Sequence, residues 1–370
     1  MARAWAEVSL DAIATNIDAL RAVAAPAEVC AVVKADGYGH GAVPVARAAL
    51  EAGASWLAVA QVPEATALRA AGIAAPVLLL SEPRPDEIRE TLAAGVAVTA
   101  YSSELVALLG QTATAAGGHP VPVHLKVDTG MHRVGCGPQE VLPLARHILS
   151  HDSLSLDAIW THCAVADEPD DPFTARQLDR FDEVVAALEG SGIRVPMRHA
   201  ANSAGAIAHP RARYDLVRCG IAVYGIPPSP ELTGRVGLAP AVRLATEVAY
   251  VRSLPAGQGV SYGLRHHLDR DTQVATLPIG YADGVFRQLG LQGQEVLIGG
   301  RRCPMVGVVT MDQVMVDIGP DAEVARGDEA VLLGAQGDER ITPDEWAGRL
   351  GTIAYEVVCA IGARVERRYT

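Results

Sequence analysis

Short apolar, β-branched segments alternate with alanine- and leucine-rich amphipathic stretches over residues 29–220. Stretches such as 63–71 and 174–188 repeat apolar residues at the three- and four-residue spacing of a helix. Apolar strands that alternate with helices are typical of parallel βαβ units, in which both faces of the sheet are covered. The predicted strands number eight and span residues 30–33, 56–60, 77–80, 96–99, 122–126, 156–161, 196–199 and 216–218. This pattern predicts a closed (β/α)8 barrel of TIM type, although an open doubly wound sheet would show the same alternation.

The pattern changes after a stiff, proline-rich stretch at 226–230. Short strand-like segments separated by Gly, Pro and Asp then follow, with one helical pattern at 343–350. The predicted strands of this region are 242–252, 273–277, 295–298, 314–318 and 329–333. We therefore expect two domains, a barrel over 1–236 and a mostly-β domain over 237–370. The pattern alone does not place residues 5–10, for which a strand outside the barrel is one interpretation.

Composition narrows the class of protein. The chain has 370 residues, 49% of them hydrophobic, and a net charge of -12 without basic runs, which argues against a nucleic-acid partner. No apolar run reaches the ~18 residues of a membrane span, and acidic residues come too early for the apolar region of a secretory signal. The six cysteines are scattered without a C-x-x-C pair, so we expect no metal site and a cytoplasmic protein.

Polar residues follow several of the predicted barrel strands, at the end where barrel enzymes carry their chemistry. Taken singly, each has an ordinary interpretation, such as a solvated lysine, a core histidine or a helix N-cap. Together they would line one rim, and the loops after the seventh and eighth strands are a common phosphate site of this fold. A phosphate cradle facing a lysine beside a glycine-rich turn favours a Schiff base with pyridoxal phosphate. The rim residues are Lys34, Lys126, Arg133, His162, Asn202, Ser203, Arg218, Gly220 and Ile221.

Residues 31–41, Ala-Val-Val-Lys-Ala-Asp-Gly-Tyr-Gly-His-Gly, resemble the lysine motif of the alanine racemase family, of fold-type III pyridoxal-phosphate enzymes. The likeness runs from Trp-Ala-Glu at 5–7 to Ile-Ala-Tyr-Glu-Val at 353–357. It implies that Lys34 carries pyridoxal phosphate and that Arg218 faces the pyridine nitrogen. Arg133 would bind the substrate carboxylate, and Lys126 would be a carbamylated lysine that steadies it. The resemblance implies that the other cofactor contacts are Tyr38, His162, Asn202, Ser203, Gly220, Ile221 and Tyr355.

Residues 260–263, 280–284 and 309–313 resemble the family's catalytic-tyrosine, entrance and substrate-carboxylate segments. They imply that Tyr262 is the second catalytic residue and that Tyr281 and Met311 contact the substrate. They also imply a homodimer in which each mostly-β domain completes its partner's site. Thr310 and Ala354 depart from the Cys and Pro of many members, which affects the expected entrance geometry.

The implied activity is interconversion of L- and D-alanine, supplying D-alanine for cell-wall peptidoglycan. Lys34 and Tyr262 would act as bases on opposite faces of the substrate. A racemase for serine or for a broad range of amino acids is an alternative, as is a fold-type III decarboxylase. Arg218 disfavours the decarboxylase, which would place an acidic residue at the ring nitrogen. A non-catalytic barrel that only holds pyridoxal phosphate would lack the domain that carries Tyr262.

Overall fold

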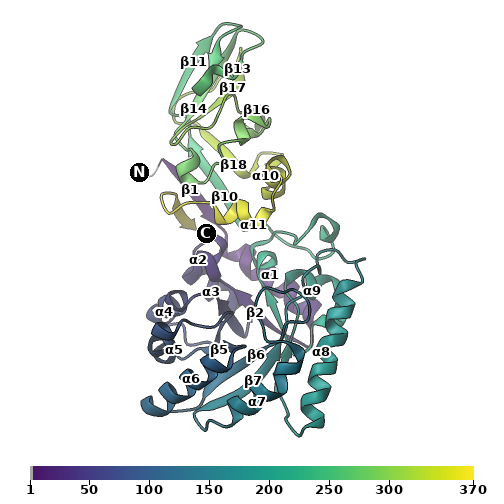
Figure 1. Cartoon of the computed structure of the whole chain (residues 1–370). Helices are drawn as coiled ribbons and strands as arrows, with labels where there is room; N and C mark the ends of the chain where they lie inside the picture. Colours follow the sequence, from purple (N-terminus) through teal and green to yellow (C-terminus); the bar gives the residue numbers. More distant parts are fainter. Residues whose placement is uncertain (1–2) are drawn as a thin grey trace. The chain divides into compact units, whose positions relative to one another are not determined.

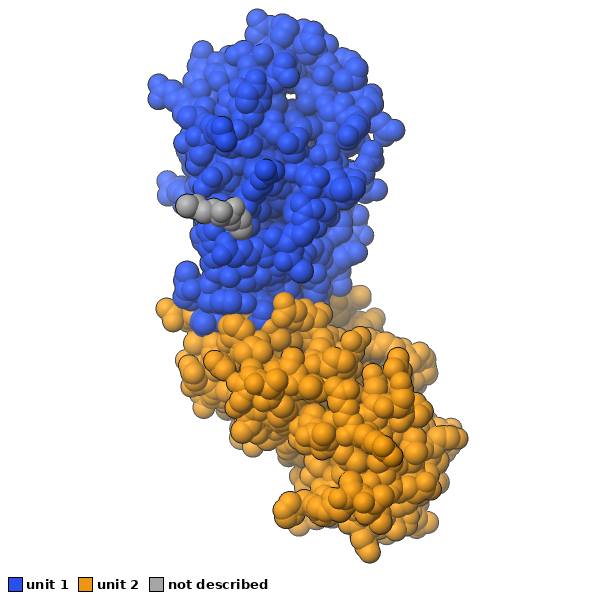
Figure 2. All heavy atoms as spheres, turned by 90° about the vertical axis from the view of Figure 1, so that its left-hand side faces the viewer, with its two compact units in different colours: residues 1–10, 38–41, 240–370 blue, residues 11–37, 42–239 orange. Residues whose placement is uncertain are grey.

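The computed structural model describes residues 3–370 (Figure 1). The chain forms two compact units, drawn in different colours in Figure 2. The barrel unit comprises Asp11–Gly37 and Ala42–Ala239. The β unit comprises residues 3–10, Tyr38–Gly41 and Pro240–Thr370. The β unit thus takes two segments from the predicted range 1–236, because each pairs or packs with strands and helices near the end of the chain.

The barrel unit contains one sheet of eight parallel strands, whose order is β8-β7-β6-β5-β4-β3-β2-β9. Backbone hydrogen bonds from Asp215 N to Arg198 O (3.0 Å) and from Arg218 N to Ala201 O (2.9 Å) join its two ends. The predicted (β/α)8 barrel is therefore confirmed, and the open sheet is wrong. The strands are β2 (Glu28–Val32), β3 (Trp56–Val59), β4 (Val77–Leu79), β5 (Ala97–Ala100), β6 (Val121–Lys126), β7 (Leu154–Trp160), β8 (Met197–His199) and β9 (Leu216–Cys219).

Helices surround these strands in Figure 1. The helix α7, for example, buries Val141, Leu144, Ala145 and Ile148, which form an apolar stripe at helical spacing. The helices are α1 (Leu10–Ala24), α3 (Ala42–Glu51), α4 (Val62–Ala70), α5 (Ile88–Ala94), α6 (Ser103–Ala116), α7 (Val141–Leu149), α8 (Phe173–Gly190) and α9 (Ser203–Ala208). Within residues 3–370 no helix combines the length and apolar character needed to cross a membrane.

The β unit has three sheets and two helices. The largest sheet has the order β16-β15-β18-β10-β1-β20, with β19 paired to β18; the others are β11-β14-β17 and β12-β13. The strands are β1 (Ala4–Val8), β10 (Val242–Glu247), β11 (Tyr250–Leu254), β12 (Gly259–Val260), β13 (His266–His267), β14 (Thr272–Leu277), β15 (Glu295–Ile298), β16 (Arg301–Pro304), β17 (Val314–Gly319), β18 (Glu329–Gln336), β19 (Glu339–Ile341) and β20 (Glu366–Tyr369). The helices are α10 (Pro343–Leu350) and α11 (Ala354–Cys359).

The segment that the pattern left unplaced is a strand outside the barrel. β1 pairs antiparallel with β10 and parallel with β20, so its partners lie more than 230 residues away in sequence. The single strand predicted over 242–252 is wrong. The chain leaves β10 at Val248, which bonds to Asp328, and enters a different sheet at Ala249, which bonds to Thr276. The other predicted strands of this region and the helix at 343–350 are confirmed.

Candidate active site

Lys34 begins a left-handed turn at the carboxyl end of β2. The turn, α2 (Lys34–Tyr38), has φ angles of 53° at Ala35, 50° at Asp36 and 61° at Gly37. A left-handed conformation costs a residue other than glycine about 1–2 kcal/mol. Side chains hold this turn in place: Ala35 N donates to Glu64 Oε1 (2.6 Å), and Ala42 N donates to Asp36 Oδ1 (2.9 Å).

Strained backbone is concentrated beside the predicted site residues. Seven non-glycine residues within 3–370 have a positive φ, and six of them lie within four residues of Lys34, Arg133 or Tyr262. These six are Ala35, Asp36, Tyr38, His132, Ser261 and Leu264. Such strain persists only where the surrounding structure imposes it, and it clusters at functional sites.

Arg218 lies at the end of β9 and is only 3% exposed. Its Nη1 bonds to His199 Nδ1 (2.8 Å), and its Nη2 bonds to Thr161 O (2.9 Å), Ala200 O (3.0 Å) and His162 Nδ1 (3.2 Å). Within residues 3–370 no carboxylate lies at ion-pair distance from Arg218, so all its hydrogen-bond acceptors are carbonyl and imidazole groups. Burial lowers the Arg218 pKa to about 10, which still leaves the group charged at neutral pH.

These contacts fix the tautomers of two buried histidines. A guanidinium has no acceptor, so His199 Nδ1 must accept from Arg218 and carry no proton. His199 Nε2–H then donates to His124 Nδ1 (3.1 Å). Burial and the Arg218 charge lower the pKa of His199 well below its usual value and that of His124 to about 3. Both rings are therefore neutral: His199 accepts from Arg218, and His124 accepts from His199, so the chain of hydrogen bonds holds Arg218 in one orientation.

Lys126 ends β6 beside the same group of residues. It is 4% exposed, and its Nζ lies 4.1 Å from the centre of the Trp160 ring. Arg218 Cζ lies 4.4 Å from that ring. Burial, followed by the charges of Arg218 and Arg133, lowers the Lys126 pKa to about 7. The Lys126 amine therefore loses its proton at a lower pH than an ordinary lysine, and the neutral amine is the nucleophilic form.

The loop after β6 carries Arg133 on an exposed turn. Asp128 closes the turn, since its Oδ1 accepts from Gly130 N (2.9 Å) and His132 N (3.1 Å), while its Oδ2 contacts His132 Nδ1 (3.1 Å). Burial lowers the pKa of His162 well below its usual value. Four nearby positive charges lower it further, those of Arg218, Arg133, Lys126 and Lys34. The rim cations predicted from the sequence therefore do gather at one end of the barrel.

Ser203 and Gly220 connect the loops after β8 and β9. Ser203 Oγ accepts from Gly220 N (2.9 Å) and Ala222 N (3.4 Å), which leaves the hydroxyl hydrogen to donate elsewhere. Asn202 is the N-cap of α9, with Oδ1 accepting from Gly205 N (2.8 Å). Its ordinary interpretation as a helix cap therefore holds.

Ile221 is buried at the start of η4 (Ile221–Tyr224) in the barrel unit, whereas the remaining predicted residues belong to the β unit. Tyr38 is buried, which raises its pKa, and its ring lies 6.3 Å from that of Tyr355 on α11. Tyr262 starts a short 3₁₀ turn, η6 (Tyr262–Leu264). The residue before it, Ser261, has a φ of 64°. Ser261 Oγ donates to Val308 O (2.7 Å), which ties this turn to the segment that leads to Met311.

Tyr281 and Met311 lie on neighbouring turns. Tyr281 N donates to Thr310 O (3.0 Å), and Ala282 N donates to Met311 O (3.1 Å). The side chains of Tyr262, Tyr281 and Met311 are 74%, 43% and 52% exposed. The turns that carry the two tyrosines are both hydrogen-bonded to residues 308–311, and several exposed large side chains on connected turns are unusual.

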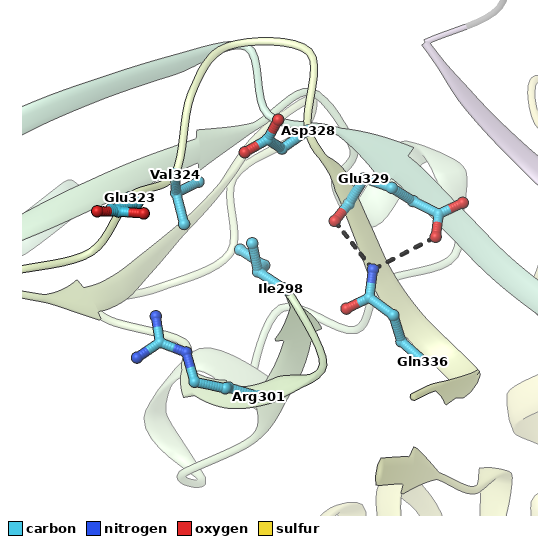
Figure 3. A pocket seen from close by; sticks show the side chains of 8 residues that line it. Ile298, Arg301, Glu323, Val324, Asp328, Glu329 and Gln336 are labelled. Carbon is cyan, nitrogen blue, oxygen red and sulfur yellow. Dashed lines mark hydrogen bonds between the residues drawn. The ribbon is translucent and has the colours of Figure 1, made fainter. Parts of the chain in front are cut away.

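A pocket of about 370 Å³ lies elsewhere in the β unit (Figure 3). Gln336 Nε2 donates there to Glu329 O (3.2 Å) and Oε1 (3.3 Å). Its three carboxylates outnumber its one guanidinium, so it disfavours a phosphate-bearing ligand. The lining residues are Ile298, Gly299, Arg301, Glu323, Val324, Asp328, Glu329 and Gln336; none is a predicted site residue.

Sequence reasoning missed several residues that shape the site. Trp160 packs against Lys126 and Arg218, and His124 contacts His199, the acceptor of Arg218. The strand pattern could have indicated both residues, since alternate residues of a barrel strand point inward. Tyr224, whose hydroxyl donates to Val32 O (2.9 Å) just before Lys34, gave no local signal.

Comparison with known proteins identifies the family. Residues 8–228 match the model of the alanine racemase N-terminal domain, and residues 241–369 match that of the C-terminal domain. Alanine racemase of Symbiobacterium thermophilum is 50% identical over 368 residues, covering 99% of this chain and 96% of that protein. Alanine racemase of Mycobacterium tuberculosis is 47% identical over 374 residues, covering 99% and 96%.

Solved structures agree with these matches. The crystal structure of alanine racemase from Streptomyces lavendulae superposes with a TM-score of 0.94 at 41% identity, covering 100% of this chain and 97% of that one. Alanine racemase from Bacillus anthracis, solved with bound L-Ala-P, gives a TM-score of 0.92 at 38% identity, covering 100% and 95%. The chain belongs to the alanine racemase family.

Proposed function

We propose that the chain interconverts L- and D-alanine with pyridoxal phosphate held on Lys34, and that Lys34 and Tyr262 act as the two bases. The observation that carries this proposal is the environment of Arg218. A buried cation bonded only to carbonyl and imidazole acceptors is costly unless it meets an electron-rich ligand group. A pyridine nitrogen is such a group.

The barrel rim fits an anionic aldehyde cofactor. Lys34 supplies the amine, and the rim cations create a positive potential despite the negative net charge of the chain. The hydroxyl hydrogen of Ser203 and the backbone N–H of Ile221 would donate to a phosphate, with the hydroxyls of Tyr38 and Tyr355 as further donors. When bound, the cofactor supplies the electron sink that acidifies the hydrogen on the substrate Cα.

Arg218 limits the chemistry to proton transfer at Cα. Its Nε–H has no partner within residues 3–370 and would be a donor for the ring nitrogen. A guanidinium that stays protonated donates a hydrogen bond and does not transfer a proton, so the ring nitrogen would remain an acceptor. This weakens the electron sink, which disfavours transamination and the decarboxylase alternative.

Each base holds or moves one proton. Lys34 Nζ would take or return the Cα proton on one face, and Tyr262 Oη would do so on the other. Arg133 would bind the substrate carboxylate, assisted by Met311, while Tyr281 would narrow the entrance and favour a methyl side chain. His162 would lie beside the cofactor ring.

The proposal is tested by incubating the protein with pyridoxal phosphate and a panel of single-enantiomer amino acids, then separating the products on a chiral column. Alanine should racemise fastest, followed by serine. Release of carbon dioxide from ornithine or diaminopimelate, without racemisation, would favour the decarboxylase.

We also propose that Lys126 is carbamylated and thereby steadies Arg133. A lowered pKa means that the amine is deprotonated above about pH 7, so it can add carbon dioxide at a pH where an ordinary lysine is charged. With ¹³C-bicarbonate, a carbamate NMR signal should grow as the pH rises through about 7. The signal should vanish in Lys126→Ala, and a signal that persists there would contradict the assignment.

Finally, we propose that two copies share their active sites, with Tyr262 and Met311 completing the partner's barrel rim. The exposed Tyr262, Leu264, Tyr281 and Met311 support a surface that another copy covers.

Mixing two inactive variants tests this sharing. Lys34→Ala and Tyr262→Phe should each be nearly inactive, but a heterodimer would have one site with both defects and one with none. After random subunit exchange of equal amounts, activity should recover to about a quarter of the wild-type level, since half of the dimers are mixed. A mixture that stays inactive after exchange has been verified by mass labelling would show that Tyr262 acts within its own subunit.

A further inference from the structure

Arg364 bridges two carboxylates from separate turns of the β unit. Its Nε lies 3.2 Å from Asp283 Oδ1, and its Nη2 donates to Asp312 Oδ1 at 2.7 Å. Asp283 belongs to η7 (Tyr281–Asp283), and Asp312 directly follows Met311. One planar guanidinium thus joins the turn that carries Tyr281 to the turn that carries Met311.

The Asp283 end of this bridge is buried and firmly held. The Asp283 side chain is 8% exposed, whereas those of Arg364 and Asp312 are 55% and 56% exposed. Asp283 Oδ2 accepts from Gly280 N (2.9 Å), and Asp283 O accepts from Gly362 N (3.0 Å). Asp283 is therefore fixed, and Arg364 extends from it to a carboxylate on an exposed loop.

The Met311 turn has two further restraints. The Thr310 hydroxyl donates to Gln313 O (2.9 Å) and accepts from Gln313 N (3.1 Å), which closes the turn internally. A Cβ at Gly280 would collide with the carbonyl oxygens of Thr310 and Met311, so only glycine allows the two turns to approach this closely. Thr310, where many family members have Cys, therefore shapes the turn, while Arg364 restrains its exposed side.

We propose that Arg364 is a positioning residue that holds Met311 and Tyr281 in fixed relation, and so sets the width of the entrance for the substrate side chain. This inference rests on the proposed function, because it assigns the substrate to Tyr281 and Met311. Arg364 itself need not contact the substrate. A displacement on the order of 1 Å at such residues can cost up to ~10²-fold in rate, so a surface ion pair can affect specificity while contributing little to stability.

The first test uses amide hydrogen exchange on the protein without cofactor. In Arg364→Gln, the amides of Tyr281 and Ala282, which bond to the Met311 turn, should exchange about 3- to 10-fold faster than in the wild type. The matched control is Arg368→Gln, which removes an exposed ion pair to Glu366 on β20 and should leave these amides unchanged. Unchanged exchange in Arg364→Gln, or equal acceleration in both variants, would overturn the proposal.

The second test uses steady-state kinetics of the protein loaded with pyridoxal phosphate. In Arg364→Gln, kcat/KM for alanine should fall about 10-fold while serine loses less, so the alanine-to-serine preference narrows. Asp312→Asn should have the same effect, and the double variant should be no worse than either single one. Faster exchange without a change in preference would overturn the proposal, because the bridge would then be structural only.

The variant Arg364→Lys controls for a folding defect, because it keeps the positive charge but cannot span both carboxylates. It should show the same faster amide exchange and the same narrowed alanine-to-serine preference as Arg364→Gln. If Arg364→Lys behaves as the wild type, the bridging role is wrong. Failure of the wild-type protein to racemise any amino acid would instead refute the proposed function, and the exchange result would remain interpretable.

Discussion

Replacement of Lys34 by alanine is expected to abolish racemisation of alanine. The change removes the amine that would hold pyridoxal phosphate and one of the two bases, so the loss should exceed the ~10²–10⁴-fold typical of a single positioned base. In the wild-type protein, borohydride should reduce the bond between the cofactor and the lysine to a stable adduct. Mass spectrometry should locate this adduct on Lys34. The variant should yield no such adduct.

The composition of the chain makes this experiment unusually clear. The sequence contains only two lysines, Lys34 and Lys126, against 29 arginines. Lys126 is thus the only lysine besides Lys34 that could react with an aldehyde, and the terminal amine is the remaining primary amine. Lys126→Ala is the matched control and should retain the adduct on Lys34. An adduct on Lys126 in the wild-type protein would show that the assignment of Lys34 is wrong.

Replacement of Tyr262 by phenylalanine should lower racemisation by ~10²–10⁴-fold, because it removes one proton carrier and keeps the ring. The cofactor should still attach to Lys34, since Tyr262 lies on the β unit and not on the barrel turn. Rates in both directions are measured by polarimetry or by coupled D-alanine oxidation.

Tyr250→Phe is the matched control for this change. Tyr250 is also an exposed tyrosine of the β unit, at 57% exposure, but it belongs to the strand β11 and not to the strained turn. It should retain wild-type rates. An equal loss in both variants would indicate a general effect of removing a surface hydroxyl, and a full rate in Tyr262→Phe would exclude Tyr262 as a base.

The barrel could be predicted because its signals are local. Most of the parallel strands are short apolar runs and the longer helices carry apolar residues at helical spacing. The alternation of strand and helix therefore appears along the sequence in the order in which neighbouring strands pair. The β unit was harder to predict. β1 joins β10 and β20 across the length of the chain, and the run at 242–252 divides between two sheets without any change in its apolar pattern.

The site was predicted from strand ends and from family resemblance, and the two sources reached different residues. Strand ends indicate Lys34, Lys126 and Arg218, because the fold itself brings these positions to one rim. They could not indicate Tyr262 or Met311, which lie on irregular turns. Arg364 lies beyond both approaches, because its role depends on two carboxylates 29 residues apart in sequence that only the folded β unit brings within its reach.

Exchange of the α-hydrogen with deuterated solvent tests the two-base assignment most directly. The family resemblance assigns Tyr262 to the L-enantiomer and Lys34 to the D-enantiomer. Tyr262→Phe, loaded with pyridoxal phosphate, should therefore still exchange the α-hydrogen of D-alanine, while exchange from L-alanine falls to the level without enzyme. Equal exchange from both enantiomers in this variant would contradict the central claim that Lys34 and Tyr262 serve opposite faces of the substrate.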